Sequence, residues 1–338
     1  MSISSPLHLV ILAAGKGTRM KSDKAKVLHK VFYAPMLHHV LDAVAPLQAA
    51  KTIVIVGHQR QAVEETVSTY PVTLAVQEEQ LGTGHAVLCA EAMVDSDEGC
   101  VMILCGDTPL IRPETLQAML QDHRDKKATV TVMTTILDNP THYGRIVSDS
   151  DGSVLAIVEE KDASAEEKKI QEINAGIYCI DTGFLFSHLK NIGTNNSQGE
   201  VYLTDIVTQA VNENISVQKF INPAAADVLG VNSRLELSQA HHELQLRRND
   251  ELMAGGVTMI SPETIQVSPE SCIGQDGRLH PGVEIRGSSK IGPGCDICAG
   301  AILDSVTLGK NCTIGPYSCL NNCELSDGES VAPHSHKC

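Results

Sequence analysis

The chain has 338 residues, enough for two domains, and its formal net charge of −15 excludes general affinity for nucleic acid, which requires a basic face. Its 42% hydrophobic and 20% charged residues are typical of a globular protein, and no stretch approaches the ~18 consecutive apolar residues of a membrane span. Because the N-terminus lacks a basic region and an export cleavage site, we expect a cytoplasmic protein with mostly reduced cysteines.

The first predicted element is a buried parallel strand over Leu7–Leu12, followed by a turn of small residues, Ala13–Arg19. Two glycines in this turn permit unusual backbone angles, so that consecutive N–H groups can converge on phosphate oxygens. Lys16, Arg19 and Lys26 add the positive charge that a polyphosphate needs. The turn matches neither the Walker A pattern nor Gly-x-Gly-x-x-Gly. It therefore predicts a phosphate-binding loop of another kind.

Apolar runs alternate with amphipathic stretches from residue 1 to 232, which predicts an α/β, Rossmann-like domain with a mostly parallel sheet and helices on both faces. Further strands are expected over Thr52–Val56, Val72–Val76, Val101–Leu104 and Thr129–Thr134, and helices over Met36–Ala45, Gln61–Thr69 and Glu114–Arg124. Arg145–Val147 and Val154–Val158 flank a turn and predict a hairpin laid over the sheet.

Two segments of this domain carry candidate binding residues. Asp107 follows the predicted strand Val101–Leu104, at the sheet edge where α/β folds bind ligands, and its carboxylate suits Mg²⁺. Helix capping by Asp107 is the alternative. Gln77–His85 follows the predicted strand Val72–Val76 and offers side-chain amides that can read a pyrimidine edge. The segment could equally be a plain loop that leads into a helix.

The second half of the chain changes character at a predicted linker helix, 233–256. Ser233 and Glu236 have the spacing of a capping box, and Gly255-Gly256 supplies the stop. Beyond it, residues 257–338 carry an aliphatic residue every six positions, with one slip of one residue, which predicts a short left-handed parallel β-helix of three or four coils rather than an ordinary β-rich domain. The aliphatic positions are Val267, Ile273, Leu279, Ile285, Ile291, Ile297, Leu303, Leu308, Ile314 and Leu320.

Cysteines cluster within these repeats, with Cys295-x-x-Cys298 followed by Cys312, Cys319 and Cys323. The pattern has some character of a zinc site. We expect small buried residues of the repeat instead, because no second Cys-x-x-Cys follows.

The string Leu12–Met20, followed by Lys26-Val27-Leu28-His29, resembles the entry motif of the sugar-1-phosphate nucleotidyltransferases. It is most similar to the bacterial UDP-N-acetylglucosamine pyrophosphorylases, the uridylyltransferase half of bifunctional uridylyltransferase/acetyltransferases, over residues 7–255. Three positions depart from that pattern: Ala25 replaces Pro, Cys105 replaces Tyr and Ala175 replaces Thr.

The resemblance implies that UTP and N-acetylglucosamine 1-phosphate give UDP-N-acetylglucosamine and pyrophosphate, with Mg²⁺ as cofactor. Arg19 and Lys26 would be catalytic, and Asp107 and Asn232 would hold the metal. The nucleotide would be bound by Leu12, Ala13, Ala14, Gly15, Gln77, Gly82, Thr83 and Asp107, and the sugar by Gly144, Glu159, Asn174 and Asn232.

The repeats further predict a homotrimer, since β-helices of this class commonly associate side by side. Because the chain shows no acetyltransferase stretch before Cys338, we expect no acetyl transfer. Two alternatives remain open: a related enzyme for another base or sugar, and a non-catalytic regulatory subunit.

Overall fold

The computed structural model describes residues 5–338, which divide into two compact units. The first unit contains the residues up to Lys30 and Ala34–Glu236, and the second contains Val31–Tyr33 and Leu237–Cys338. Within residues 5–338 no helix is both long and apolar enough to cross a membrane.

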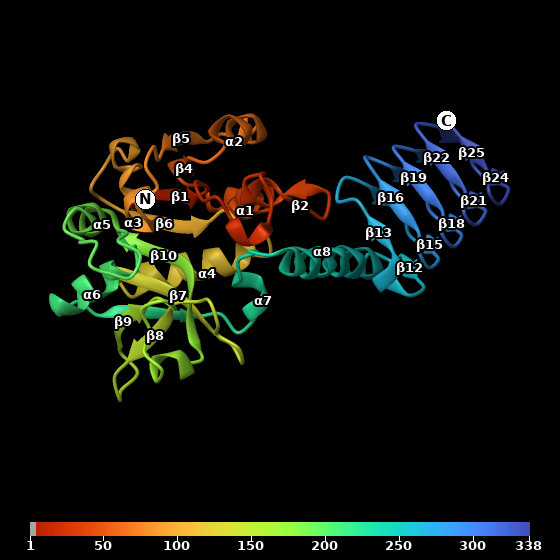
Figure 1. The fold of residues 1–338 in the computed structure, drawn as a ribbon. Helices are drawn as coiled ribbons and strands as arrows, with labels where there is room; N and C mark the ends of the chain where they lie inside the picture. The colour runs from red at the N-terminus through yellow and green to blue at the C-terminus, as the bar shows by residue number, and fades with distance from the viewer. Residues whose placement is uncertain (1–4) are drawn as a thin grey trace. The chain divides into compact units, whose positions relative to one another are not determined.

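The first unit is built on a nine-stranded sheet whose main path runs β11-β7-β10-β6-β1-β4-β5 (Figure 1). Neighbouring strands on this path are parallel except that β10 runs antiparallel to both β6 and β7. The mostly parallel α/β sheet is thus confirmed. The strands are β1 (Leu7–Leu12), β4 (Lys51–Val56), β5 (Thr73–Val76), β6 (Cys100–Cys105), β7 (Val130–Ile136), β8 (Arg145–Ser148), β9 (Val154–Val158), β10 (Glu172–Asp181) and β11 (Val217–Ile221).

Helices cover both faces of this sheet, because alternate strand residues point to opposite sides. Along β1, Leu9 and Ile11 enter one core with α1, α2 and α4, whereas Val10 enters the other core with α5 and α6. The helices are α1 (Met36–Val44), α2 (Arg60–Val67), α3 (Thr83–Leu88), α4 (Pro113–Asp125), α5 (Thr182–Leu189), α6 (Asp205–Asn212) and α7 (Ala225–Val228).

The predicted hairpin forms, as β8 paired antiparallel with β9, but its placement over the sheet was wrong. Arg145 of β8 pairs with Ile173 of β10, so the hairpin extends the sheet itself. Two strands of the main path, β10 and β11, were not predicted; β10 carries Asn174 and Gly176, which interrupt its apolar pattern.

Helix α8 (Arg234–Ala254) begins at the predicted capping box. The Ser233 N–H donates to Glu236 Oε2 at 3.0 Å, and the Glu236 N–H donates to Ser233 Oγ at 3.2 Å. Both reciprocal hydrogen bonds of the capping box are therefore formed.

The second unit contains a stack of short strands with the arrangement of a left-handed parallel β-helix, in three sheets of five, five and four strands. Arg278 pairs with Asp296, eighteen residues on, whereas Asp296 pairs with Thr313, seventeen residues on, which reflects the predicted one-residue slip. Thr313 pairs with Ser330, again seventeen residues on, which reveals a second slip that the sequence analysis did not include. The strands are β12 (Thr258–Met259), β13 (Gln266–Val267), β14 (Cys272–Ile273), β15 (Arg278–Leu279), β16 (Glu284–Arg286), β17 (Lys290–Ile291), β18 (Asp296–Ile297), β19 (Ile302–Asp304), β20 (Thr307–Leu308), β21 (Thr313–Ile314), β22 (Cys319–Asn321), β23 (Glu324–Leu325), β24 (Ser330–Val331) and β25 (His336–Lys337).

The stack holds four complete coils, the upper end of the three or four that were predicted, and one additional strand in each of two sheets. Met259 and Lys337 of the first and last strands were missed because the other strands use branched aliphatic residues or Leu at these positions. Leu325 and Val331 were missed because the step from Leu320 to Leu325 is five residues and not six. Two further short strands, β2 (Lys30–Val31) and β3 (Ala34–Pro35), pair with each other.

Candidate active site

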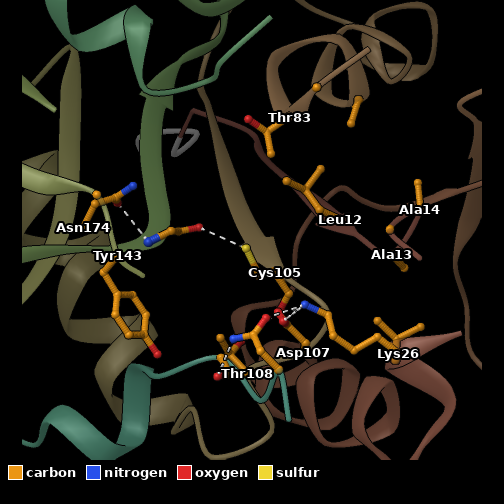
Figure 2. Close-up of a pocket in the computed structure, with 18 of the residues that line it drawn as sticks. Leu12, Ala13, Ala14, Lys26, Thr83, Cys105, Asp107, Thr108, Tyr143 and Asn174 are labelled. Atoms are coloured by element: carbon orange, nitrogen blue, oxygen red, sulfur yellow. Dashed lines mark hydrogen bonds and ion pairs between the residues drawn. The ribbon is translucent and has the colours of Figure 1, made fainter. Parts of the chain in front are cut away.

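A cavity of about 450 Å³ opens at the carboxyl ends of β1, β5 and β6 in the first unit. Figure 2 shows Asp107 and Lys26 together on one side of it, with Asn174 and Tyr143 across the space. Every residue that the family resemblance assigned to catalysis, metal, nucleotide or sugar lines this cavity: Leu12, Ala13, Ala14, Gly15, Arg19, Lys26, Gln77, Gly82, Thr83, Asp107, Gly144, Glu159, Asn174 and Asn232. Lys16, the other cation expected to serve a polyphosphate, is not among the lining residues.

The small-residue loop after β1 uses its two glycines differently. Gly17 has a φ of +67°, and a Cβ there would lie 2.6 Å from the Cβ of Lys26. Gly17 is thus needed both for its backbone angle and for the close approach of Lys26. Gly15 has no positive φ, against the expectation for both glycines, and a Cβ on it would meet nothing within 4 Å. Its lack of a side chain leaves the cavity open beside the loop.

A cation occupies the space between the two predicted metal ligands. The Lys26 ammonium forms an ion pair with Asp107 Oδ2 and donates to Asn232 Oδ1 at 2.9 Å. The Asn232 amide nitrogen is directed away, since it donates to the Gly230 carbonyl at 2.9 Å. Two oxygens from distant parts of the chain therefore converge on one positive charge, and oxygen is the ligand that Mg²⁺ prefers. The donor set fits a divalent ion.

The segment 230–232 is held against the end of β6 by its backbone. The Val231 N–H donates to the Asp107 carbonyl at 2.8 Å. A Cβ on Gly230 would lie 3.2 Å from Asp107 Oδ2, so glycine permits this approach. The segment thereby brings the Asn232 side chain within reach of the aspartate.

One side of the cavity is formed by the end of β5 and the start of α3. Gln77 is buried, and its amide nitrogen donates to the Gly82 carbonyl at 3.0 Å. Gln80 donates to the Ala14 carbonyl at 3.0 Å, which ties this segment to the loop after β1. Gly82 has a φ of +111°, and a Cβ on it would lie 2.5 Å from the Val201 carbonyl oxygen. Only glycine meets both conditions.

The opposite side is formed by β8–β10. The register of β10 against β7 shifts between Asn174 and Tyr178, an irregularity of the kind that redirects side chains at sites. The Asn174 N–H donates to the Gly144 carbonyl at 2.9 Å. A Cβ on Gly144 would lie 3.6 Å from Glu159 Oε2. The three predicted sugar residues of this region therefore adjoin one another.

Burial changes the acidity of two groups in the cavity. Burial raises the pKa of the Glu159 carboxyl, and the Thr204 hydroxyl, which donates to Glu159 Oε1 at 3.3 Å, opposes this rise. Burial also raises the pKa of the Cys105 thiol to about 12, so the thiol is protonated at neutral pH. A protonated thiol is a poor nucleophile, which leaves Cys105 a packing role.

The cavity also includes residues that the sequence did not single out, among them Thr108, His142 and Glu200. Glu200 precedes Val201, whose N–H donates to the Leu81 carbonyl at 2.8 Å. No local pattern marks Glu200, because long-range contacts such as this one carry its segment to the cavity.

Comparisons with known proteins agree with this geometry. The model of the nucleotidyl transferase family matches residues 8–243, a range that includes the whole cavity. The bifunctional protein GlmU of Desulfotalea psychrophila is 53% identical over 331 residues, which are 98% of this chain and 98% of that protein. The bifunctional protein GlmU of Pelobacter propionicus is 43% identical over 328 residues, 97% of this chain and 71% of that protein.

A solved structure shares the fold. A Bacillus anthracis chain described as a glucose-1-phosphate thymidylyltransferase superposes with a TM-score of 0.56 at 20% identity, over 70% of this chain and 94% of that one. At that identity the likeness extends to the fold alone.

Proposed function

Because the chain belongs to the nucleotidyl transferase family, we propose that it transfers uridylyl from UTP to N-acetylglucosamine 1-phosphate, which gives UDP-N-acetylglucosamine and pyrophosphate. The observation that carries the proposal is the single cavity that gathers the loop after β1, the Gln77–Thr83 segment and the Glu159–Asn174 side. The names of the GlmU relatives support the same choice of chemistry.

In this reaction the sugar phosphate attacks the α-phosphorus of the nucleotide in line, and pyrophosphate leaves. No protein nucleophile is required, so catalysis consists of positioning and of neutralising phosphate charge. Arg19 and Lys26 are the cations of the cavity lining, and we assign them to the reacting phosphates. Lys26 would exchange Asp107 and Asn232 for phosphate oxygens when the nucleotide binds.

Members of the family generally use a divalent metal, and we propose Mg²⁺ held by Asp107 and Asn232. Bound there, the ion would supply charge neutralisation at the phosphates. The support is the pair of oxygens that already holds the Lys26 ammonium. Asp107→Ala should lose several kcal/mol of transition-state stabilisation, an order of magnitude typical of metal sites; full activity in this variant would contradict the assignment.

Pyrophosphate release from UTP, dTTP, CTP and GTP with several sugar 1-phosphates tests the substrates. We expect the highest kcat/KM with UTP and N-acetylglucosamine 1-phosphate, no activity in EDTA, and recovery on addition of Mg²⁺. Preference for another pair would favour the related-enzyme alternative, and no release with any pair would favour a regulatory subunit. Gln77→Ala should relax the UTP preference by ~1–3 kcal/mol, since a buried partner is removed.

Two further features are part of the proposal. We infer a homotrimer formed through the β-helix, which sedimentation at micromolar concentration would show as three copies. The predicted lack of acetyl transfer is opposed by the name of the Desulfotalea protein, which is bifunctional and matches this chain over 98% of its length. Incubation with acetyl-CoA and glucosamine 1-phosphate tests whether the chain transfers acetyl: formation of N-acetylglucosamine 1-phosphate would contradict the prediction, and its absence would support it.

A further inference from the structure

The β-helix places donor side chains from two stacked rungs on one outer face. Leu279 of β15 pairs with Ile297 of β18, and both side chains are buried. Because successive residues of a strand point to opposite sides, the residues that flank each buried position face outward. His280 follows Leu279 and Cys298 follows Ile297, so these two side chains are stacked, with Asp296 beside them.

The three side chains converge. His280, Asp296 and Cys298 each offer one ligand atom, and these atoms lie within 4.8 Å of one another. His280 Nε2 and Asp296 Oδ1 are already 2.7 Å apart, in a hydrogen bond. Their side chains are 27% and 42% exposed, so water and ions reach them.

This arrangement differs from the cysteine pattern of the sequence. Cys295 is buried, and its Sγ contacts the Gly309 carbonyl oxygen at 3.1 Å. Its thiol therefore belongs to the interior of the β-helix. Within the described residues 5–338, the Cys298 thiol converges with the side chains of His280 and Asp296 and not with Cys295.

Imidazole nitrogen, carboxylate oxygen and thiolate sulfur are the three ligand types that Zn²⁺ accepts, at about 2.0–2.3 Å from the ion. Such bond lengths place tetrahedral ligand atoms about 3.3–3.8 Å apart. The ligand atoms of this half-buried group lie within 4.8 Å of one another, at most about 1 Å beyond that spacing, which side-chain rotation can close. The thiol proton of Cys298 would be released to solvent on binding.

We propose that His280, Asp296 and Cys298 form a Zn²⁺ site, with water as the fourth ligand, that joins the rungs β15 and β18. The site lies wholly in the second unit and does not depend on the proposed nucleotidyl transfer.

Titration of the full metal-free chain with Co²⁺ tests the site, because a Co²⁺–thiolate bond gives a charge-transfer band in the near ultraviolet and tetrahedral geometry gives visible bands. We expect one equivalent of Co²⁺ to produce both, and Zn²⁺ to abolish them by displacement. Zinc measured by mass spectrometry after equilibration should be lower by one equivalent per chain in Cys298→Ser.

Matched variants make the test specific. Cys272→Ser removes an exposed thiol elsewhere on the β-helix, more accessible than the half-buried Cys298, and should leave the bands unchanged. Asp296→Asn removes the anionic oxygen ligand and should weaken Co²⁺ binding at least tenfold. Its amide oxygen can still accept the His280 hydrogen bond, so the melting temperature in EDTA should stay unchanged. His280→Ala should also weaken binding.

Three results would overturn the proposal. They are the absence of a thiolate band in the unaltered chain, a band that persists in Cys298→Ser, and a band lost instead in Cys100→Ser. The last would place the metal at the buried group of Cys100, His123 and Cys179.

Discussion

Replacement of Gly17 by alanine is the sharpest test of how the loop after β1 builds the site. Alanine at a φ of +67° costs about 1–2 kcal/mol in the left-handed region. Its Cβ would also lie 2.6 Å from the Cβ of Lys26, about 1 Å short of an optimal contact. Such overpacking typically adds about 1–3 kcal/mol, so Gly17→Ala should lower the free energy of unfolding by about 2–5 kcal/mol in total.

The same contact predicts a loss of activity. Relief of the clash must move Lys26, whose ammonium lies between Asp107 and Asn232. A displacement of about 1 Å at a catalytic group can cost on the order of 10²-fold in rate, and we expect a fall in kcat of that order. Urea titration followed by circular dichroism at 222 nm measures the stability, and pyrophosphate release measures the activity.

Gly152→Ala is the matched control, because Gly152 has a φ of +84° but nothing within 4 Å of an added Cβ. It should cost only the backbone strain of about 1–2 kcal/mol and leave kcat unchanged. If Gly17→Ala were no less stable than Gly152→Ala and equally active, the reasoning that joins Gly17 to Lys26 would be refuted.

Three other predictions concern single contacts. Thr204→Val removes the hydrogen bond to Glu159 and should raise the KM for the sugar phosphate about three- to tenfold, as expected for a bond of about 0.5–1.5 kcal/mol. It should also raise the pKa of Glu159 further, whereas Thr204→Ser should retain the wild-type KM and the wild-type pKa of Glu159. Burial lowers the pKa of His8, whose ring nitrogens lack a partner, so the unfolded chain binds this proton more readily and stability falls as pH drops below about 6.5. Urea midpoints at pH 8 and 5.5 should therefore differ less in His8→Leu, although His29 and His123, which share the lowered pKa, keep part of the difference. Ser233→Ala should cost about 1 kcal/mol through the capping box, and it should add little when Glu236→Ala is already present; strict additivity would show that the two bonds are independent.

Most elements of the fold could be predicted because their signals are local. Leu7–Leu12 reads as a strand from its own residues, and the Ser233–Glu236 pair marks a helix start within four positions. Strands β10 and β11 were missed. Asn174 and Gly176 interrupt the first, and the site irregularity that needs them is visible only against β7.

The candidate site was predicted through resemblance to a family more than through chemistry. Gln77, Glu159 and Asn174 taken singly look like turn or surface residues, and nothing in their spacing joins them. The cavity exists because the sheet order brings the ends of β1, β5 and β6 together and pairs β10 beside them.

The sequence by itself determined the elements that depend on periodic apolar residues or on contacts between residues close in the chain: the apolar strands, the capped helix and the six-residue repeat. The tertiary structure alone decided which distant groups meet. Lys26 meets Asn232 across 206 positions, Glu200 reaches the cavity through Val201 and Leu81, and Cys298 faces His280 rather than Cys295. The reason is that a side chain's direction follows from local backbone geometry, whereas its partners follow from strand order and rung stacking, which depend on the packing of the whole chain.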